Sequence, residues 1–267
     1  GNLYPALYAK AFYDGMTAEG QQNVLNLVRC AWAGSQRYGA LVWSGDVHSS
    51  FRSMREQLAA GLSMGMAGIP WWNADLGGFT GGETTDPAFR ELLARWFAWG
   101  VFTPVMRMHG DRLPYEPPKE EFRNGVRQFG SGAPNEVWSF GEEMQALLSR
   151  CIRLREALRP YLRKIMAEAH QTGAPAMRPL FFDFPQDDAA WAEETAYMFG
   201  PDLLVAPVLE AGVTTRGVYL PKGAAWVEQS TGKTYEGGAR VTANAPLSVI
   251  PVFARAGSGL SLTEYLA

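Results

Sequence analysis

The segment Val42–Phe51, "VWSGDVHSSF", marks the point where a short apolar strand, Ala40 to Trp43, ends at a Gly-Asp corner and gives way to a helix. The helix continues through "RSMREQLAAGLSMGM". Asp46 at this corner has two interpretations. It could cap the helix, since a side-chain oxygen there accepts from a free backbone N–H, although Ser49 and Ser50 lie closer. Alternatively, it projects from the carboxyl end of a strand, where α/β sheets and barrels place their chemistry.

Strand and helix patterns alternate over the first 175 residues. "NVLNLVRCAW" and "YGALVW" are typical of strands, a helix follows from about Ser50 to Met66, and Asp86-Pro87 opens another with a broad apolar stripe. "FTPVMRMHG" is the next strand candidate. We find about four strand–helix units, whereas a closed (β/α)₈ barrel needs eight and ~250 residues. The pattern therefore predicts an α/β fold that is half of a TIM-type barrel.

The sequence pattern changes twice in the rest of the chain. Residues 112–140 are polar and rich in Pro and Gly, which at that length indicates a functional surface excursion, and one long helix is expected from Glu142 to Gln171, ended by Gly173. From Met177 onward, short apolar runs separated by Pro, Gly and Asp are typical of a small antiparallel β-sandwich. We therefore predict two domains, residues 1–175 forming the second half of a barrel and residues 176–267 a β-sandwich.

Composition excludes several function classes. The chain has 24 Lys and Arg against 27 Asp and Glu, with no basic stripe, so a nucleic-acid partner is not expected. No apolar run is long enough for a bilayer, so no membrane partner is expected. Cys30 and Cys151 lack metal-ligand spacing and are expected to be buried; unpaired, they favour a cytoplasmic setting, although localisation stays open. The N-terminus shows neither a signal peptide nor an initiator Met, consistent with a piece of something longer.

Four polar side chains stand at or just beyond the ends of successive strand candidates: Arg29, Asp46, Asp75 and His109. Singly, they have structural explanations: an ion pair, a helix cap, a turn residue and a core histidine. Together they match the way a parallel barrel builds its site from several loops. Aromatic residues accompany them, and flat apolar rings beside charged groups suit a sugar. The candidates for these aromatic walls are Trp32, Trp43, Trp71, Trp72 and Phe79.

Five motifs identify the family that this sequence resembles. They are "VRCAWAGSQRYGALVWSGD", "GIPWWNADLGGF", "RWFAWGVFTPVMRMHGD", "YMFGPDLLVAPVLEAG" and "APLSVIPVFARAG". In order and over essentially the whole chain, they resemble the later part of the catalytic module of glycoside hydrolase family 31, the α-glucosidases and α-xylosidases. The resemblance implies a retaining, exo-acting enzyme with a (β/α)₈ barrel followed by β-sandwich domains, acting on a small oligosaccharide or α-glycoside.

The resemblance also implies roles for individual residues. Asp46 in "WSGD" matches the general acid/base, and Arg29 and His109 match residues that bind sugar hydroxyls. Trp43 matches an aromatic wall, while Asp75 and Phe79 in "NADLGGF" match a pocket loop. No metal or organic cofactor is implied, since two carboxylates suffice for this chemistry.

One departure from the family pattern matters for function. The nucleophilic aspartate of the family belongs to a motif upstream of the helix that begins this chain, and no matching motif exists here. A retaining mechanism needs both carboxylates, ~5–5.5 Å apart. The chain is therefore expected to work only with the missing N-terminal half of the same enzyme and to be inactive alone. The alternative is a non-catalytic carbohydrate-binding or structural fragment; the choice between glucoside and xyloside stays open.

Overall fold

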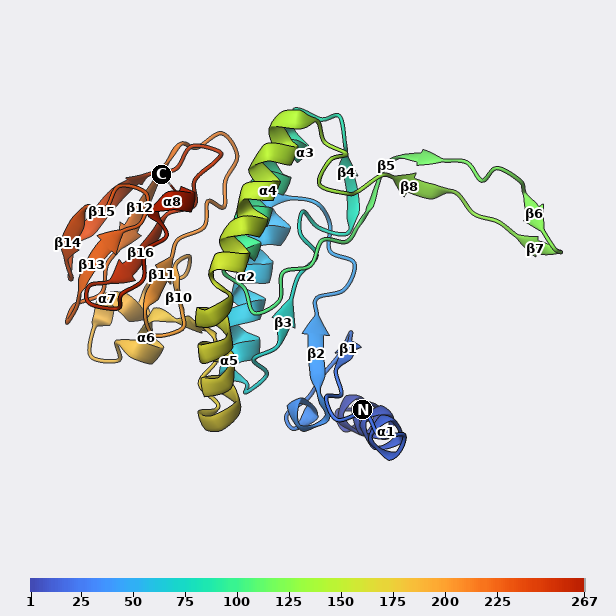
Figure 1. The fold of residues 1–267 in the computed structure, drawn as a ribbon, viewed down its shortest axis with the longest axis horizontal. Coiled ribbons are helices and arrows are strands. Elements are labelled where there is room, and N and C mark those ends of the chain that lie inside the picture. The colour runs from blue at the N-terminus through green and yellow to red at the C-terminus, as the bar shows by residue number, and fades with distance from the viewer. Residues whose placement is uncertain (267) are drawn as a thin grey trace.

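The first part of the chain is an arc of parallel strands backed by helices (Figure 1). A computed structural model describes residues 1–266. Strands β1, β2 and β3 pair in that order, all parallel, with Val28 opposite Val42 and Val42 opposite Trp72. The elements of this part are α1 (Tyr4–Ala18), β1 (Asn26–Val28), η1 (Ser35–Tyr38), β2 (Ala40–Trp43), α2 (Phe51–Met66), β3 (Trp72–Asn73), β4 (Thr80–Glu83) and α3 (Pro87–Gly100).

Local capping fixes where the two main helices of the arc begin. Ser50 accepts a hydrogen bond from the Ser53 N–H at 3.1 Å and opens α2, so the cap of this helix is a serine and not Asp46. Asp86 accepts from the Ala88 N–H at 2.9 Å and opens α3, with Pro87 as its first residue. Helix α3 is buried on nearly every side, which places it in the middle of the molecule.

The strand expected at residues 102–110 does not form. This segment begins as a turn at residues 102–104 and continues without regular secondary structure. A hydrogen bond from Leu76 N–H to Arg107 C=O at 3.2 Å joins it to the loop after β3, with no ladder around it. The next strand is β5 (Asp111–Glu116), which pairs in parallel with β4 and antiparallel with β8 (Ser131–Ala133).

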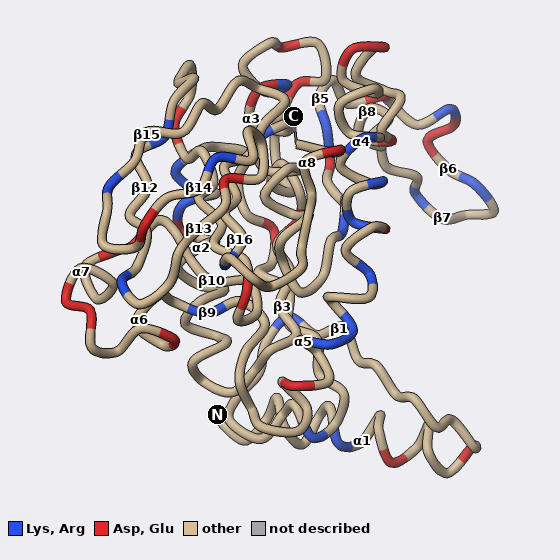
Figure 2. The backbone as a smooth tube through the Cα atoms, turned by 60° about the vertical axis from the view of Figure 1, so that its left-hand side comes forward, with Lys and Arg blue, Asp and Glu red and all other residues tan. Residues whose placement is uncertain are grey.

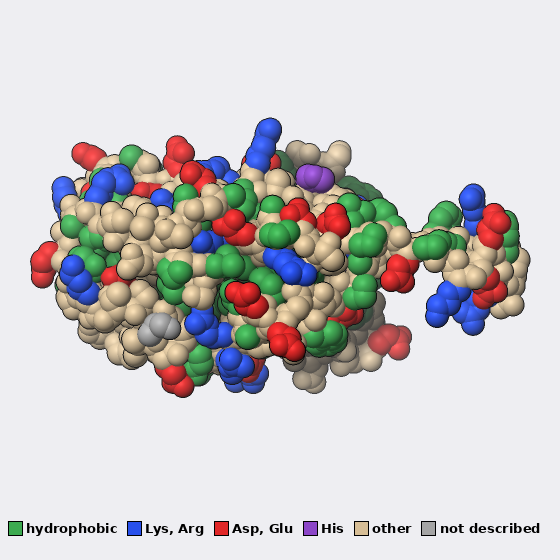
Figure 3. Space-filling model, turned by 90° about the horizontal axis from the view of Figure 1, so that it is seen from above, with side chains coloured by type: hydrophobic (Ala, Val, Ile, Leu, Met, Phe, Trp, Pro, Cys, Tyr) green, Lys and Arg blue, Asp and Glu red, His purple; other side chains and the backbone are tan. Residues whose placement is uncertain are grey.

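Beyond β5, the chain forms a two-stranded arm that leaves the body of the molecule. Its outer end carries β6 (Phe122–Arg123) paired with β7 (Val126–Arg127). Figure 1 shows the arm as a long ribbon, and Figure 3 shows its tip as a lobe joined to the body by a narrow neck. The predicted surface excursion is thus a β-ribbon.

The single long helix expected from Glu142 to Gln171 is two helices. Helix α4 (Glu142–Ala157) ends at Leu158, and α5 (Arg159–Thr172) begins directly after it. Pro160 explains the break, because its ring has no N–H to donate and clashes with the preceding turn. Gly173 adopts φ 81° after α5 and ends it, as expected.

The C-terminal part is antiparallel, which confirms the predicted fold class of a partial barrel followed by a β domain. One six-stranded sheet has the order β14-β13-β16-β11-β10-β9, and β12 pairs with β15. The elements are β9 (Met177–Pro179), α6 (Leu180–Asp183), α7 (Asp188–Trp191), β10 (Tyr197–Phe199), β11 (Leu203–Val205), β12 (Thr215–Tyr219), β13 (Ala225–Glu228), β14 (Thr234–Glu236), β15 (Arg240–Asn244), β16 (Val252–Arg255) and α8 (Thr263–Leu266).

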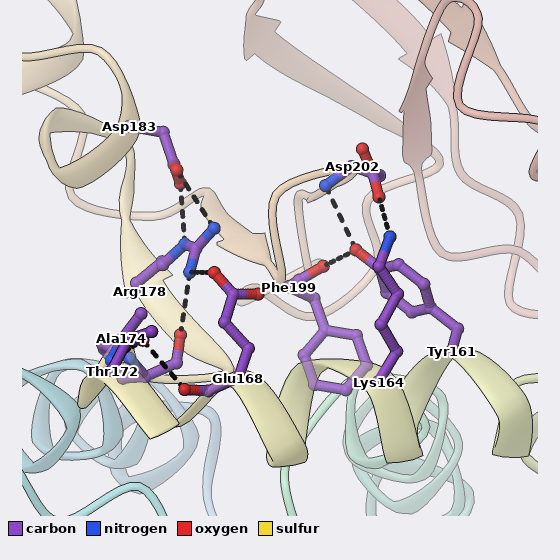
Figure 4. Close-up of polar contacts among 10 residues, drawn as sticks. Tyr161, Lys164, Glu168, Thr172, Ala174, Arg178, Asp183, Phe199 and Asp202 are labelled. Atoms are coloured by element: carbon purple, nitrogen blue, oxygen red, sulfur yellow. Dashed lines mark hydrogen bonds and ion pairs between the residues drawn. The ribbon is translucent and has the colours of Figure 1, made fainter. Parts of the chain in front are cut away.

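The helical layer of α3, α4 and α5 joins the two parts through one shared core. The residues of this core include Trp96, Leu148, Ile165, Phe199 and Val252. Polar bonds reinforce it (Figure 4): the Tyr161 hydroxyl donates to the Phe199 carbonyl at 2.8 Å, and Arg178 forms two bonds with Asp183, at 2.8 and 3.0 Å. Arg178 also lies 3.8 Å from Glu168 of α5.

A buried arginine makes a second link between the parts. Arg95 of α3 is 5% exposed and donates to four backbone carbonyls of the β domain. The acceptors are the carbonyls of Val213 at 2.8 Å, Pro246 at 2.9 Å, Ala245 at 3.0 Å and Val249 at 3.5 Å. Burial lowers the pKa of Arg95, while nearby Glu91 opposes that shift.

The surface carries mixed charge. Figure 2 shows basic and acidic residues interspersed along the chain, without a stripe of one sign. None of the helices described over residues 1–266 is long and apolar enough to cross a membrane.

The prediction that both cysteines are buried is wrong for Cys30, which lies exposed beyond the edge strand β1. Cys151 is buried, and burial raises the pKa of its thiol to about 11.

Candidate functional site

The loops that follow the parallel strands are tied to one another at one rim of the arc. Phe79 and Thr80 N–H groups both donate to the Val47 carbonyl, at 2.7 and 3.1 Å, and Ser49 N–H donates to the Thr80 carbonyl at 3.0 Å. Asp111 N–H donates to the Phe79 carbonyl at 2.8 Å. Because β1, β2 and β3 are parallel, the residues after each strand meet on this rim.

The Gly-Asp corner presents Asp46 to solvent beside an arginine. Gly45 has φ 82°, and a Cβ there would lie 3.2 Å from the Arg29 guanidinium nitrogens, so glycine lets that side chain lie against the backbone. The Arg29 Nη2 donates to Asp46 Oδ2 at 3.2 Å. The Asp46 side chain is 38% exposed, and water or a ligand can therefore reach it.

Two guanidinium groups lie close to the Trp43 ring. The central carbon of Arg29 is 5.2 Å from the centre of the Trp43 ring system, and that of Arg107 is 5.5 Å away. Both distances fall within the ~6 Å range of cation–π attraction. Arg107 also forms an ion pair with Asp75, which connects the loop after β3 to the ring at the end of β2.

Asp75 is the buried carboxylate of the rim. Its side chain has no exposed surface, and its Oδ2 has no hydrogen-bond partner among the described residues. Burial raises the pKa of Asp75, whereas Arg107 and, to a smaller extent, His109 oppose the rise and Asp46 adds to it. Asp46 and His109 therefore each lie within electrostatic reach of Asp75.

Phe79 and His109 complete the group, with ring centres 5.2 Å apart. We call the set of Arg29, Trp43, Asp46, Asp75, Phe79, Arg107 and His109 the rim cluster. The structure brings together all six residues singled out from the sequence. Of the other aromatic candidates, Trp72 is buried, while Trp32 is 51% exposed and Trp71 38% exposed.

Two arginines at the site were not predicted from the sequence. Arg107 stands two residues before His109, and its position in the same motif was the available signal. Arg112 is fully buried below the rim and donates to Asn135 Oδ1 at 2.9 Å, to the Leu76 carbonyl at 3.1 Å and to Ser49 Oγ at 3.2 Å. Burial lowers the pKa of Arg112 to about 10. Arg112 fixes the base of the arm against the loops of the site.

A hollow of about 540 Å³ opens on the inner side of the arc. Its lining is mostly apolar and includes Leu25, Leu41, Trp71, Met106 and Met108. Such a surface on the concave side of parallel strands is the part of a barrel that is normally filled by side chains from the other strands. Among residues 1–266, no group of three or more His, Cys, Asp or Glu side chains is placed to hold a metal ion.

The arrangement can bind and protonate a polar ligand. An exposed carboxylate held by a guanidinium can exchange a proton with a bound oxygen, while the rings of Trp43 and Phe79 offer flat apolar contact. The rim cluster contains two carboxylates: Asp46, which a ligand can reach, and Asp75, which is enclosed.

Comparisons with known proteins place these observations in a family. Residues 1–165 match the family model described as "Glycosyl hydrolases family 31 TIM-barrel domain", and residues 173–260 match "Glycosyl hydrolase family 31 C-terminal domain". An alpha-xylosidase of Saccharolobus solfataricus is 36% identical over 98% of this chain, which covers 33% of that protein. Alpha-glucosidase 2 of Bacillus thermoamyloliquefaciens is 35% identical, again over 98% of this chain and 30% of that protein.

Comparison with solved structures supports the same family. An alpha-xylosidase of this family from a soil metagenome, complexed with xylose, superposes with a TM-score of 0.95 at 57% identity; the match covers 99% of this chain and 39% of that one. A dextranase from Flavobacterium johnsoniae, complexed with glucose, gives a TM-score of 0.83 at 34% identity over 96% of this chain and 30% of that one. The chain thus spans about a third of the length of the relatives it matches. By its motifs, fold and matches along its length, the chain belongs to glycoside hydrolase family 31.

Proposed function

We propose that this chain is part of a retaining, exo-acting α-glycosidase that removes terminal α-linked sugars by double displacement, with Asp46 as its general acid/base. The observation that carries the proposal is the position of Asp46: an accessible carboxylate at the carboxyl edge of β2, paired with Arg29 and next to an aromatic ring. In the first step it protonates the leaving glycosidic oxygen, and in the second it removes a proton from the attacking water.

Asp75 cannot be the nucleophile of this reaction. Its side chain has no exposed surface and it is paired with Arg107, so no anomeric carbon could reach it. The family pattern implies that the nucleophile lies outside this chain, in the N-terminal half of the same enzyme, and a retaining mechanism requires it to stand ~5–5.5 Å from Asp46. The hollow on the inner side of the arc supports this assignment, because its apolar lining needs a covering partner.

The other members of the rim cluster bind and position the sugar. Arg29 and His109 donate to its hydroxyls, and Trp43 and Phe79 provide its walls. Asp75 orients Arg107, which in turn supports Trp43. The substrate is a small α-glucoside or α-xyloside. We also propose a domain boundary at residues 175 and 176, supported by the end of α5 at Thr172 and the start of β9 at Met177.

The anomeric configuration of the first product tests the mechanism. Proton NMR of the intact enzyme acting on an aryl α-xyloside or α-glucoside should show the α-anomer first, because two inversions at the same carbon restore the original configuration. Residues 1–267 alone should show no turnover in a parallel assay. A β-anomer as first product, or turnover by this chain alone, would refute the proposal.

A further inference from the structure

A large groove lies between helix α2 and the β domain, away from the rim cluster. Its volume is about 800 Å³. One wall is a single stripe of α2 that includes Arg55, Ala59, Leu62 and Met66, and the other comes from the segments around α6 and α7. The groove shares no lining residue with the rim cluster. Figure 1 shows α2 with the parallel strands on one side and the β domain on the other.

The groove contains a rigid aromatic platform. Phe181 and Trp191 both line it, and their rings stack with centres 4.3 Å apart and planes inclined by 6°. The Trp191 indole N–H donates to the Pro185 carbonyl at 3.0 Å, which fixes the orientation of the ring. Although it is stacked on one side, Trp191 remains 56% exposed. A tryptophan held in place but left open to solvent is a preformed contact surface.

The opposite wall is held at a fixed distance by two glycines of α2. A Cβ at Gly61 would lie 2.7 Å from the Trp72 indole nitrogen, and a Cβ at Gly65 would lie 2.8 Å from the Met177 carbonyl. The helix therefore packs directly on β9, the strand from which the chain passes into α6. Because both walls are fixed in this way, the groove needs no rearrangement to accept a ligand.

The chemistry of the lining points to a neutral sugar chain. Flat apolar rings stack against the C–H faces of sugars, while carboxylates and hydroxyls along the edges bind their hydroxyl groups. Here Glu56, Glu194 and Ser63 line the same groove as the platform. Three carboxylates, those of Glu56, Glu193 and Glu194, line the groove together with one guanidinium, that of Arg55, so a polyanionic ligand is disfavoured.

We propose that this groove is a second glycan-binding site, which holds an α-glucan chain on the Phe181–Trp191 platform. Its role is to keep an oligosaccharide substrate near the enzyme while the rim cluster acts on the chain end. The proposal depends on the family assignment for its ligand class and does not depend on the catalytic role of Asp46.

Affinity electrophoresis of the intact enzyme in gels containing soluble dextran tests the proposal. Dextran should retard the wild type, and Trp191→Ala should weaken binding by about 10-fold, as expected for loss of one aromatic stacking surface. Trp191→Phe keeps a flat ring and should retain most of the retardation. Turnover of a small aryl α-glycoside should be unchanged in both variants, which shows that they fold correctly.

Two controls assign the binding to the groove. Phe182→Ala removes a neighbouring aromatic that is 39% exposed but does not line the groove, and it should leave retardation unchanged. Asp46→Ala should also leave it unchanged, even if that variant shows the proposed function to be wrong. The inference is overturned if dextran does not retard the wild type, which is the result expected if the rest of the enzyme covers the groove. Equal retardation of Trp191→Ala and wild type, or loss of retardation in either control, would overturn it as well.

Discussion

Replacing Arg107 by Met should destabilise the intact enzyme in a pH-dependent way. Asp75 has no exposed side-chain surface, its Oδ2 has no partner among the described residues, and Arg107 is its ion-pair partner. Leaving a buried polar group without a partner costs about 1–3 kcal/mol, and losing the contact with Trp43 adds about 0.5–1 kcal/mol. The two contributions together amount to about 1.5–4 kcal/mol, and because Arg107 is 27% exposed and water can partly replace it, we expect a loss of about 1.5–3 kcal/mol at neutral pH.

The sign of the pH dependence follows from the direction of the pKa shift. Burial raises the pKa of Asp75 and Arg107 opposes the rise, so removing Arg107 raises that pKa further. A carboxyl group with a raised folded-state pKa contributes stability that is fully present below its unfolded pKa and is lost as pH rises through the folded pKa. The difference in unfolding free energy between the wild type and Arg107→Met should therefore be small in acid. It should grow between the folded-state pKa of Asp75 in the wild type and the higher one in the variant, and level off above the latter.

Thermal unfolding of the intact enzyme across a pH series measures this effect. At about 2–4 °C per kcal/mol for a domain of this size, the melting temperature at neutral pH should fall by about 3–12 °C. The control is the double variant Asp75→Asn/Arg107→Met, compared with Asp75→Asn, because an amide cannot titrate. A deficit that is equal at all pH values, or one that keeps its pH dependence in the Asn background, would refute the reasoning.

Three further predictions follow from other parts of the structure. In the intact enzyme, Asp46→Ala should slow hydrolysis of substrates with poor leaving groups by about 10²–10⁴-fold and activated aryl glycosides far less; equal losses would mean that Asp46 donates no proton. Tyr161→Phe should lower the free energy of unfolding by about 1–3 kcal/mol in denaturant titration, because the buried Phe199 carbonyl and the partly buried Asp202 N–H lose their partner; unchanged stability would contradict this. Gly39→Ala should reduce soluble yield far more than Gly20→Ala, since both have positive φ but a Cβ at Gly39 would lie 2.1 Å from the Val24 carbonyl; equal yields would disprove the clash.

The sequence allowed prediction of those parts of the fold that local chemistry decides. The starts of α2 and α3 follow from Ser50 and Asp86, whose side chains bond backbone groups two or three residues away. The break before Pro160 was missed because the apolar stripe continues across it, through Leu158 and Tyr161, and hides the missing hydrogen bond.

The features of the fold and the site that were not predicted depend on tertiary contacts. Residues 102–110 look like a strand by composition, but no ladder forms around the single bond between Leu76 and Arg107. Cys30 lies in an apolar run of the sequence, which predicts burial, but it follows the edge strand β1 and is exposed. The convergence of the rim cluster was predictable because parallel strands bring their ends together, whereas the pairing of Arg107 with Asp75 depends on how two loops lie against each other.

The four carbonyl bonds of Arg95 have a consequence for how the molecule opens. Separating the β domain from α3 would leave a guanidinium and several acceptors in an apolar layer without partners, and this makes a partly open state costly. The two halves should therefore behave as one cooperative unit in native-state hydrogen exchange, with the amides of α3 and of residues 213–249 opening at the same free energy. Mechanical pulling from either terminus should likewise meet one main rupture event at this junction, and not a gradual peeling of the C-terminal strands.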